Sequence, residues 1–285
     1  MPIILLSDVI ASNCEASKRA KKQAPLLNID GNPKTVKGQK AGYLTAILYL
    51  APSSVSGQNV CSMAALAGCI AGCLSTAGHG GMHKKGALIS TPDGLIPDNI
   101  VQRARIRKTN FFHNDQAGFM ALLIIEIIKF IKRAKKRGLI PVIRLNGTSD
   151  IRWELIPVPG FNNIFDMFPD IQFYDYTKIG NRKNIPSNYY LCLSYSESNQ
   201  KYVDYITRAA RDTGYNLVVV FEKILPKTFL GLQVVNGDLN DLRFLDHKGV
   251  IVGLKAKGKG KQDTSGFVIR QARIDADQLI NRIAA

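Results

Sequence analysis

Three of the five cysteines in this 285-residue chain lie within one short segment, NVCSMAALAGCIAGCLSTAGHGG, as Cys61, Cys69 and Cys73. The intervals of seven and three residues contain mainly glycine and other small side chains, which let the backbone fold tightly around a bulky inorganic group. Thiolates are preferred ligands of zinc and of iron–sulfur clusters. The spacing therefore predicts that the three cysteines share one metal centre.

The sequence leaves the identity of this metal centre open. Zinc needs a fourth ligand, which His79, His83 or the more distant Cys14 could supply. A [4Fe-4S] cluster could instead leave one iron open for chemistry. Disulfides explain the segment less well, because the number of cysteines is odd and no secretory signal precedes them. The competing interpretation is that these cysteines, like Cys192, are small buried apolar side chains.

The chain is strongly basic, with 38 Lys and Arg against 22 Asp and Glu and a net charge of +16. This balance predicts a polyanionic partner, with nucleic acid, either DNA or RNA, as the first candidate. The glycine-spaced run KAKGKGK could follow a phosphate backbone, and Phe111, Phe112 and Tyr174 could stack on bases. The candidate nucleic-acid contacts are Arg103, Arg105, Arg107, Lys108, Lys255, Lys257, Lys259 and Lys261.

No segment of the sequence predicts a membrane span. The most apolar stretch, FMALLIIEIIKFIKRAKKRG, is interrupted by Glu126, Lys129 and Arg133, which line one face of a helix. The opening MPIILLSDVI lacks the basic start and the cleavage site of a signal peptide. We therefore expect a cytoplasmic protein without a membrane partner, and the sequence indicates no particular protein partner.

Residues 1–40 are basic and rich in turn-forming residues, which predicts an N-terminal arm with little regular structure. Over residues 41–285, apolar runs of strand length alternate with helical patterns at 114–137 and 198–212. Apolar strands that alternate with helices predict a buried parallel sheet, and their number favours a single α/β barrel-like domain, closed or partly open. The predicted strands are 41–50, 139–145, 170–176, 189–195, 216–222, 231–237 and 249–255.

Polar residues follow several of these predicted strands. Ligands of parallel α/β proteins bind at the carboxyl ends of the strands, so we expect these residues to share one cleft with the cysteine segment. Each could alternatively cap a helix or lie in a solvated loop. The candidate cofactor-binding residues are Asn146, Ser149, Asp150, Asp175, Lys178, Ser194, Ser196 and Glu197. A further group, Asp238, Asp241 and Asp246, could hold magnesium, although NGDLND is also an ordinary turn sequence.

Seven motifs together resemble the phage protein family called gene product 88. They are NVCSMAALAGCIAGCLSTAGHGG, VQRARIRKTNFF, VIRLNGTSDIRWE, FYDYTK, YYLCLSYSES, VVNGDLNDLRFLD and GVIVGLKAKGKGK. The resemblance covers about residues 41–270. The resemblance implies a protein of a phage or mobile element that works in the cytoplasm of the infected or host cell.

A more distant similarity is to radical S-adenosylmethionine enzymes, in which a three-cysteine loop after the first barrel strand holds a [4Fe-4S] cluster. It implies that Cys61, Cys69 and Cys73 hold the cluster, while the LNGTSD and SYSE segments bind S-adenosylmethionine. Three functions follow as alternatives: an iron–sulfur enzyme of this type acting on nucleic acid or nucleotides, a non-catalytic nucleic-acid-binding protein with a structural zinc or cluster, and a magnesium-dependent nuclease or related phosphoryl-transfer enzyme.

Overall fold

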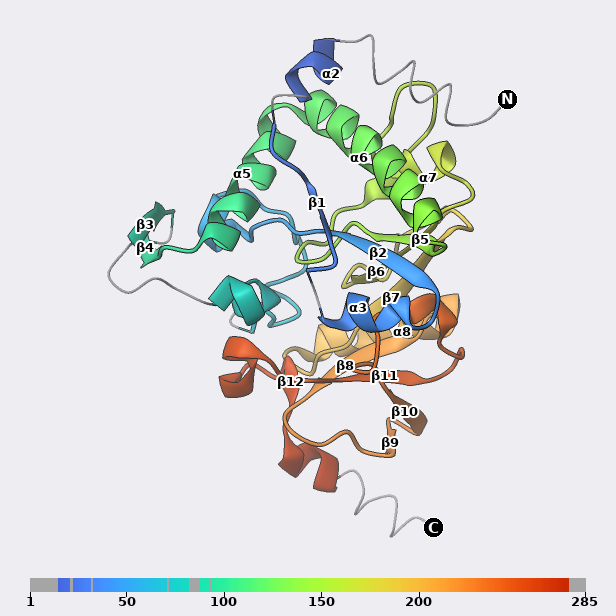
Figure 1. The fold of residues 1–285 in the computed structure, drawn as a ribbon. Coiled ribbons are helices and arrows are strands. Elements are labelled where there is room, and N and C mark those ends of the chain that lie inside the picture. Colours follow the sequence, from blue (N-terminus) through green and yellow to red (C-terminus); the bar gives the residue numbers. More distant parts are fainter. Residues whose placement is uncertain are drawn as a thin grey trace. The chain divides into compact units, whose positions relative to one another are not determined.

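A computed structural model describes residues 15–20, 23–31, 33–70, 72–81, 88–92 and 94–276. The chain divides into two compact units. The first unit comprises Met1–Cys61, His83–Asp175 and Lys183–Tyr190, and the second comprises Ser62–Met82, Tyr176–Arg182 and Leu191–Ala285. Both units combine helices with mainly parallel strands (Figure 1).

The first unit is built on parallel strands. β2 (Tyr43–Leu48) pairs with β5 (Ile140–Arg144), and β5 pairs with β6 (Gln172–Thr177), whose residues up to Asp175 belong to this unit. β1 (Leu27–Ile29) pairs antiparallel with the other edge of β2. The middle of each parallel strand is buried, which confirms the apolar strands predicted from the sequence.

Two long helices of the first unit pack against each other, α5 (Ile100–Asn114) and α6 (Gln116–Lys136). Side chains fix where each helix begins, because Asn99 accepts hydrogen bonds from the first backbone N–H groups of α5 and Asp115 accepts one from Gly118 of α6. The sequence predicted α6, while the basic segment before it forms a helix that was not predicted.

Within the predicted N-terminal arm, the described residues 15–20 and 33–39 form helices of the first unit. α2 (Glu15–Ala20) packs against α6, and α3 (Pro33–Gln39) packs against β2. The expectation of little regular structure is therefore not met at these two helices. The remaining elements of the unit are α4 (Ser53–Ser56), β3 (Leu88–Thr91), β4 (Gly94–Pro97), η3 (Trp153–Leu155) and α7 (Ile164–Met167), of which β3 and β4 form an antiparallel pair.

The second unit also contains neighbouring parallel strands. From β7 (Tyr189–Ser194), whose residues from Leu191 onward belong to this unit, the order continues through β8 (Leu217–Phe221), β11 (Ile251–Lys255) and β10 (Leu232–Asn236). β12 (Val268–Ile269) adds a short parallel pairing to β8. Shorter elements are η1 (Leu74–Thr76), η2 (Gly78–Gly81), β9 (Thr228–Phe229), η4 (Arg243–Leu245) and η5 (Gly258–Gln262).

Helix α8 (Gln200–Thr213) supplies much of the core of the second unit. Its Tyr202 and Ile206 are fully buried together with side chains of β7, β8 and β11. Asn199 caps the start of the helix, and Gly214 ends it with a φ of 68°, a left-handed conformation that suits glycine. Both ends and the buried face agree with the pattern in the sequence.

The strand pairings give a mixed α/β fold with mainly parallel strands, as the sequence predicts. Among the described residues, the pairings do not show a closed barrel, so barrel closure stays a prediction. No helix in the described part of the chain is both long and apolar enough to cross a membrane.

Candidate functional site

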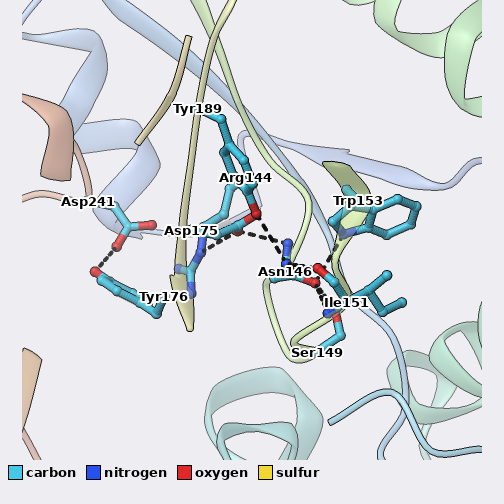
Figure 2. Close-up of polar contacts among 9 residues, drawn as sticks. All are labelled: Arg144, Asn146, Ser149, Ile151, Trp153, Asp175, Tyr176, Tyr189 and Asp241. Atoms are coloured by element: carbon cyan, nitrogen blue, oxygen red, sulfur yellow. Dashed lines mark hydrogen bonds and ion pairs between the residues drawn. The ribbon is translucent and has the colours of Figure 1, made fainter. Parts of the chain in front are cut away.

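The loop after β5 is organised by the side chain of Asn146. Its Oδ1 atom accepts hydrogen bonds from Ser149 Oγ at 2.8 Å, Ile151 N at 2.9 Å and Trp153 Nε1 at 3.1 Å (Figure 2). Asn146 and Trp153 are buried, so these bonds satisfy polar groups that water does not reach. Asn146 therefore holds the loop in one conformation.

The same loop is bound to the chain that follows β2. At Gly147 an added Cβ would lie 2.6 Å from the carbonyl oxygen of Leu48, so this close approach requires glycine. The backbone N–H of Asp150 donates to the carbonyl oxygen of Val60 at 2.7 Å. The loop thus contacts the segment that leads directly to Cys61.

Asp175, near the end of β6, joins this network. Its carboxylate accepts a hydrogen bond from the Asn146 backbone N–H at 2.8 Å and another from the Tyr189 hydroxyl at 2.9 Å. The Nε atom of Arg144 lies 3.7 Å from the same carboxylate, and the Asp175 side chain has no solvent exposure. A buried carboxylate needs such partners, because a lone charge inside a protein is very costly.

Three of the predicted cofactor-binding residues, Asn146, Ser149 and Asp175, therefore lie together in the first unit (Figure 2). Arg144 and Tyr189 complete the network and were not singled out in the sequence, although both flank predicted strand ends. The contacts described above all join these groups to the protein itself. Binding of a cofactor by these residues stays a prediction.

In the second unit, the segment that carries Cys69 and Cys73 packs against the loop after β7. Gly68 has a φ of 64°, and a Cβ added there would lie 2.5 Å from the Cβ of Ser198. Ser198 Oγ donates to the Leu66 carbonyl oxygen at 3.1 Å, and Ser265 Oγ donates to the Gly68 carbonyl oxygen at 2.7 Å. The cysteine segment and the serine-rich loop thus meet in the second unit.

The other predicted residues of that loop have mainly structural contacts. Ser196 Oγ donates to Ser198 Oγ at 3.0 Å, and the carboxylate of Glu197 accepts the Tyr195 hydroxyl at 3.1 Å. Ser194 uses its carbonyl oxygen to accept the Tyr202 hydroxyl at 2.6 Å. Lys178, earlier in the chain, is partly exposed.

The described residues do not present a ready metal centre. Cys69 is 7% exposed, Cys73 is partly exposed in the second unit, and Cys61 belongs to the first unit. Within the described ranges, no group of three or more His, Cys, Asp or Glu side chains is arranged to hold a metal ion. Cys14, His83 and the side chain of His79 lie outside the described residues. The metal centre therefore stays a prediction from the sequence, while Cys192 is fully buried in β7.

The three aspartates considered as magnesium ligands have different partners in the second unit. Asp238 accepts the backbone N–H of Lys255, at the end of β11, at 2.9 Å, and Asp241 accepts the Tyr176 hydroxyl at 3.1 Å (Figure 2). Asp246 forms an ion pair with the buried Arg243 at 3.0 Å, and burial raises the pKa of its carboxyl. Within NGDLND itself, Asn236 Oδ1 accepts the Asp238 backbone N–H at 2.9 Å, a local contact typical of a turn.

The basic run after β11 forms a defined turn, here called the lysine turn (residues 255–261). Its four lysines are exposed, and residues from Gly258 onward form η5. Asp238 holds the start of the turn through the Lys255 backbone N–H at 2.9 Å and the Lys257 ammonium at 2.8 Å. The lysine turn is thus an ordered basic surface of the second unit.

The basic residues on α5 have mixed environments. Arg103 is exposed and pairs with Asp98 through two contacts of 2.6 Å, and Arg107 is also exposed. Arg105 is only 8% exposed, with its guanidinium 5.1 Å from the centre of the Tyr49 ring. Among the aromatic candidates for base stacking, Phe112 and Tyr174 are buried.

Lys108 is buried at the contact between α5, α6 and β1. Its ammonium donates to the Leu26 carbonyl oxygen at 2.5 Å and to Asn28 Oδ1 at 3.1 Å. Glu126 of α6 accepts the backbone N–H groups of Leu26 and Leu27, each at 2.8 Å. Burial lowers the pKa of Lys108 to about 8 and raises the pKa of Glu126. The side chains of Lys108 and Glu126 thus bind the backbone of one short stretch of the N-terminal segment. The sequence analysis missed this structural role because it assigned Lys108 to nucleic-acid binding.

The fold and these sites define a mixed α/β protein whose polar networks follow mainly parallel strands and whose second unit carries a basic turn. The family model of gene product 88 matches residues 21–271, so the chain belongs to the gene product 88 family. No curated protein matches the chain, and no solved structure matches it. The comparisons add no support for the more distant resemblance to radical S-adenosylmethionine enzymes.

Proposed function

We propose that this protein binds the phosphate backbone of nucleic acid through the lysine turn of its second unit. The observation that carries the proposal is the exposure of all four lysines on a turn that Asp238 holds in place. An ordered turn holds its lysines at the surface without the entropy cost of ordering a flexible loop on binding.

The position and charge of the turn support the same function. The lysine turn begins at the last residue of β11, and ligands of parallel α/β proteins bind beyond the carboxyl ends of strands. The net charge of +16 adds long-range attraction for a polyanion. Phosphate contacts of this kind position a protein on nucleic acid but do not read its sequence.

Fluorescence anisotropy with labelled DNA and RNA, single- and double-stranded, tests the proposal. We expect binding at low salt that weakens steeply as salt rises from about 50 to 200 mM. Replacing the four lysines together with alanine should weaken binding and should reduce the slope of log K against log salt. On duplex DNA the reduction should be up to about 0.9 for each phosphate that the variant no longer neutralises. The variant changes Lys255, Lys257, Lys259 and Lys261.

A control variant with the same change of charge separates the turn from general electrostatics. It replaces four other basic residues at the surface of the second unit with alanine, namely Lys201, Lys223, Arg211 and Lys248. Equal effects of the two variants, or no binding by the wild-type protein at low salt, would contradict the proposal. The proposal assigns no reaction, and the iron–sulfur cluster, zinc and S-adenosylmethionine stay predictions from the sequence.

A further inference from the structure

Two large aliphatic side chains project into solvent from the cysteine segment. Ile70 is 59% exposed and Leu74 is 47% exposed. A single exposed aliphatic residue is ordinary on a protein surface, but here two flank Gly72 in one short segment. Their exposure leaves apolar area that a bound partner could cover.

The segment that carries these aliphatic side chains packs against the lysine turn. A Cβ added at Gly72 would lie 3.5 Å from the Cα of Gly260, so the two glycines bring their backbones together. Helix η1, which begins at Leu74, also packs against η5. Gly260 is flanked by Lys259 and Lys261, both exposed. We call Ile70, Leu74, Lys259 and Lys261 the mixed patch.

The mixed patch combines groups that suit the phosphates of a DNA duplex with groups that suit its stacked bases. Ammonium groups bind the phosphates that border the minor groove, and aliphatic side chains can insert between base steps and kink the duplex. Phosphates offer nothing to the aliphatic side chains, so these gain only by reaching the bases between the phosphate rows. The lysines beside these aliphatic side chains favour a partner whose negative charges flank an apolar part, as the phosphates of a duplex flank its stacked bases.

We propose that Ile70 and Leu74 act as apolar wedges that bend duplex DNA while Lys259 and Lys261 hold its phosphates. This inference rests on the proposed nucleic-acid binding and adds the substrate class, a deformable duplex, and the mode of contact. Pyrimidine–purine steps such as TA unstack most easily and would be the favoured points of insertion.

Bending is measured by energy transfer between dyes on the two ends of a duplex of about 20 base pairs that contains central TA steps. We expect the wild-type protein to bring the ends closer. The variant Ile70→Ala/Leu74→Ala should bind with the salt slope of the wild type, because its lysines still neutralise the same phosphates, but should leave the duplex straight. Lys259→Ala/Lys261→Ala should reduce the salt slope instead.

The matched control is Ile224→Ala/Leu245→Ala, which removes aliphatic side chains of the second unit that are 60% and 52% exposed. The control should bend the duplex as the wild type does. Bending by the Ile70/Leu74 variant equal to that by the wild type, or binding by the wild type without bending, would overturn the wedge while leaving phosphate binding intact. Absence of any binding would instead remove the proposed function and the wedge with it.

Discussion

Burial of the Lys108 ammonium makes a quantitative prediction about how stability depends on pH. The pKa of Lys108 falls from 10.5 to about 8 in the folded protein, chiefly because burial disfavours the charged form. Between these values the unfolded chain binds more protons than the folded chain, so this group makes stability rise with pH. Its contribution should increase by about 2.5 kcal/mol between about pH 7 and pH 10.

The variant Lys108→Met keeps most of the length of the side chain and removes the titrating group. Urea unfolding of wild type and variant at both pH values gives two differences in the free energy of unfolding, in which the other titrating groups cancel. We expect the wild type to gain about 2.5 kcal/mol relative to the variant on going from about pH 7 to pH 10. The control is Lys129→Met, which removes an exposed lysine from α6.

An identical difference between wild type and Lys108→Met at the two pH values would refute the reasoning. It would mean that water reaches the ammonium in the folded protein, so that the contacts with Leu26 and Asn28 do not desolvate it. A difference of opposite sign would mean that the charged form is favoured by folding, as for a lysine in an exposed ion pair.

Three further predictions concern the two units. Asp175→Asn should lower the free energy of unfolding by about 3 kcal/mol or more, because the buried Arg144 guanidinium loses its counter-charge. The control Asp170→Asn changes an exposed aspartate and should have little effect on the same urea curves. Gly68→Ala should lower the free energy of unfolding by about 2 kcal/mol in thermal or urea unfolding. The loss should exceed that of Gly78→Ala, because Gly78 also has a positive φ but has no atom within 4 Å of an added Cβ. Equal losses would show that the contact with Ser198 is unimportant. For the predicted metal centre, alanine at Cys61, Cys69 or Cys73 should in each case lower the zinc or iron content of anaerobically purified protein. The control Cys192→Ala should leave the metal content unchanged. Equal metal content in all variants would contradict the prediction.

Periodicity and apolar runs predicted the buried strands and α8 because one physical requirement, burial of apolar area, decides both pattern and structure. The helix α5 was harder to recognise, since its basic residues resemble a nucleic-acid contact. Arg105 and Lys108 are nevertheless buried, and burial of a cation depends on partners that lie far away in the chain. Local sequence does not reveal such partners, which is why the role of Lys108 could not be predicted.

The candidate site was predictable to a similar extent. Strand ends identified Asn146 and Asp175, because polar residues after apolar strands stand out. Tyr189 looked like an ordinary strand residue, and only the pairing of strands brings its hydroxyl to Asp175. The contact between Gly68 and Ser198 likewise joins residues far apart in sequence, and no spacing rule predicts it.

Strand β1 has a protective consequence. It pairs with the outer edge of β2, and an uncovered edge offers backbone N–H and C=O groups that other chains can join. The hydrogen bonds of Lys108 and Glu126 with the Leu26 backbone hold the three-residue strand β1 in place. Loss of these hydrogen bonds would expose the edge of β2 while the other strands are still folded. The chain would then self-associate into β-rich aggregates before it unfolds globally.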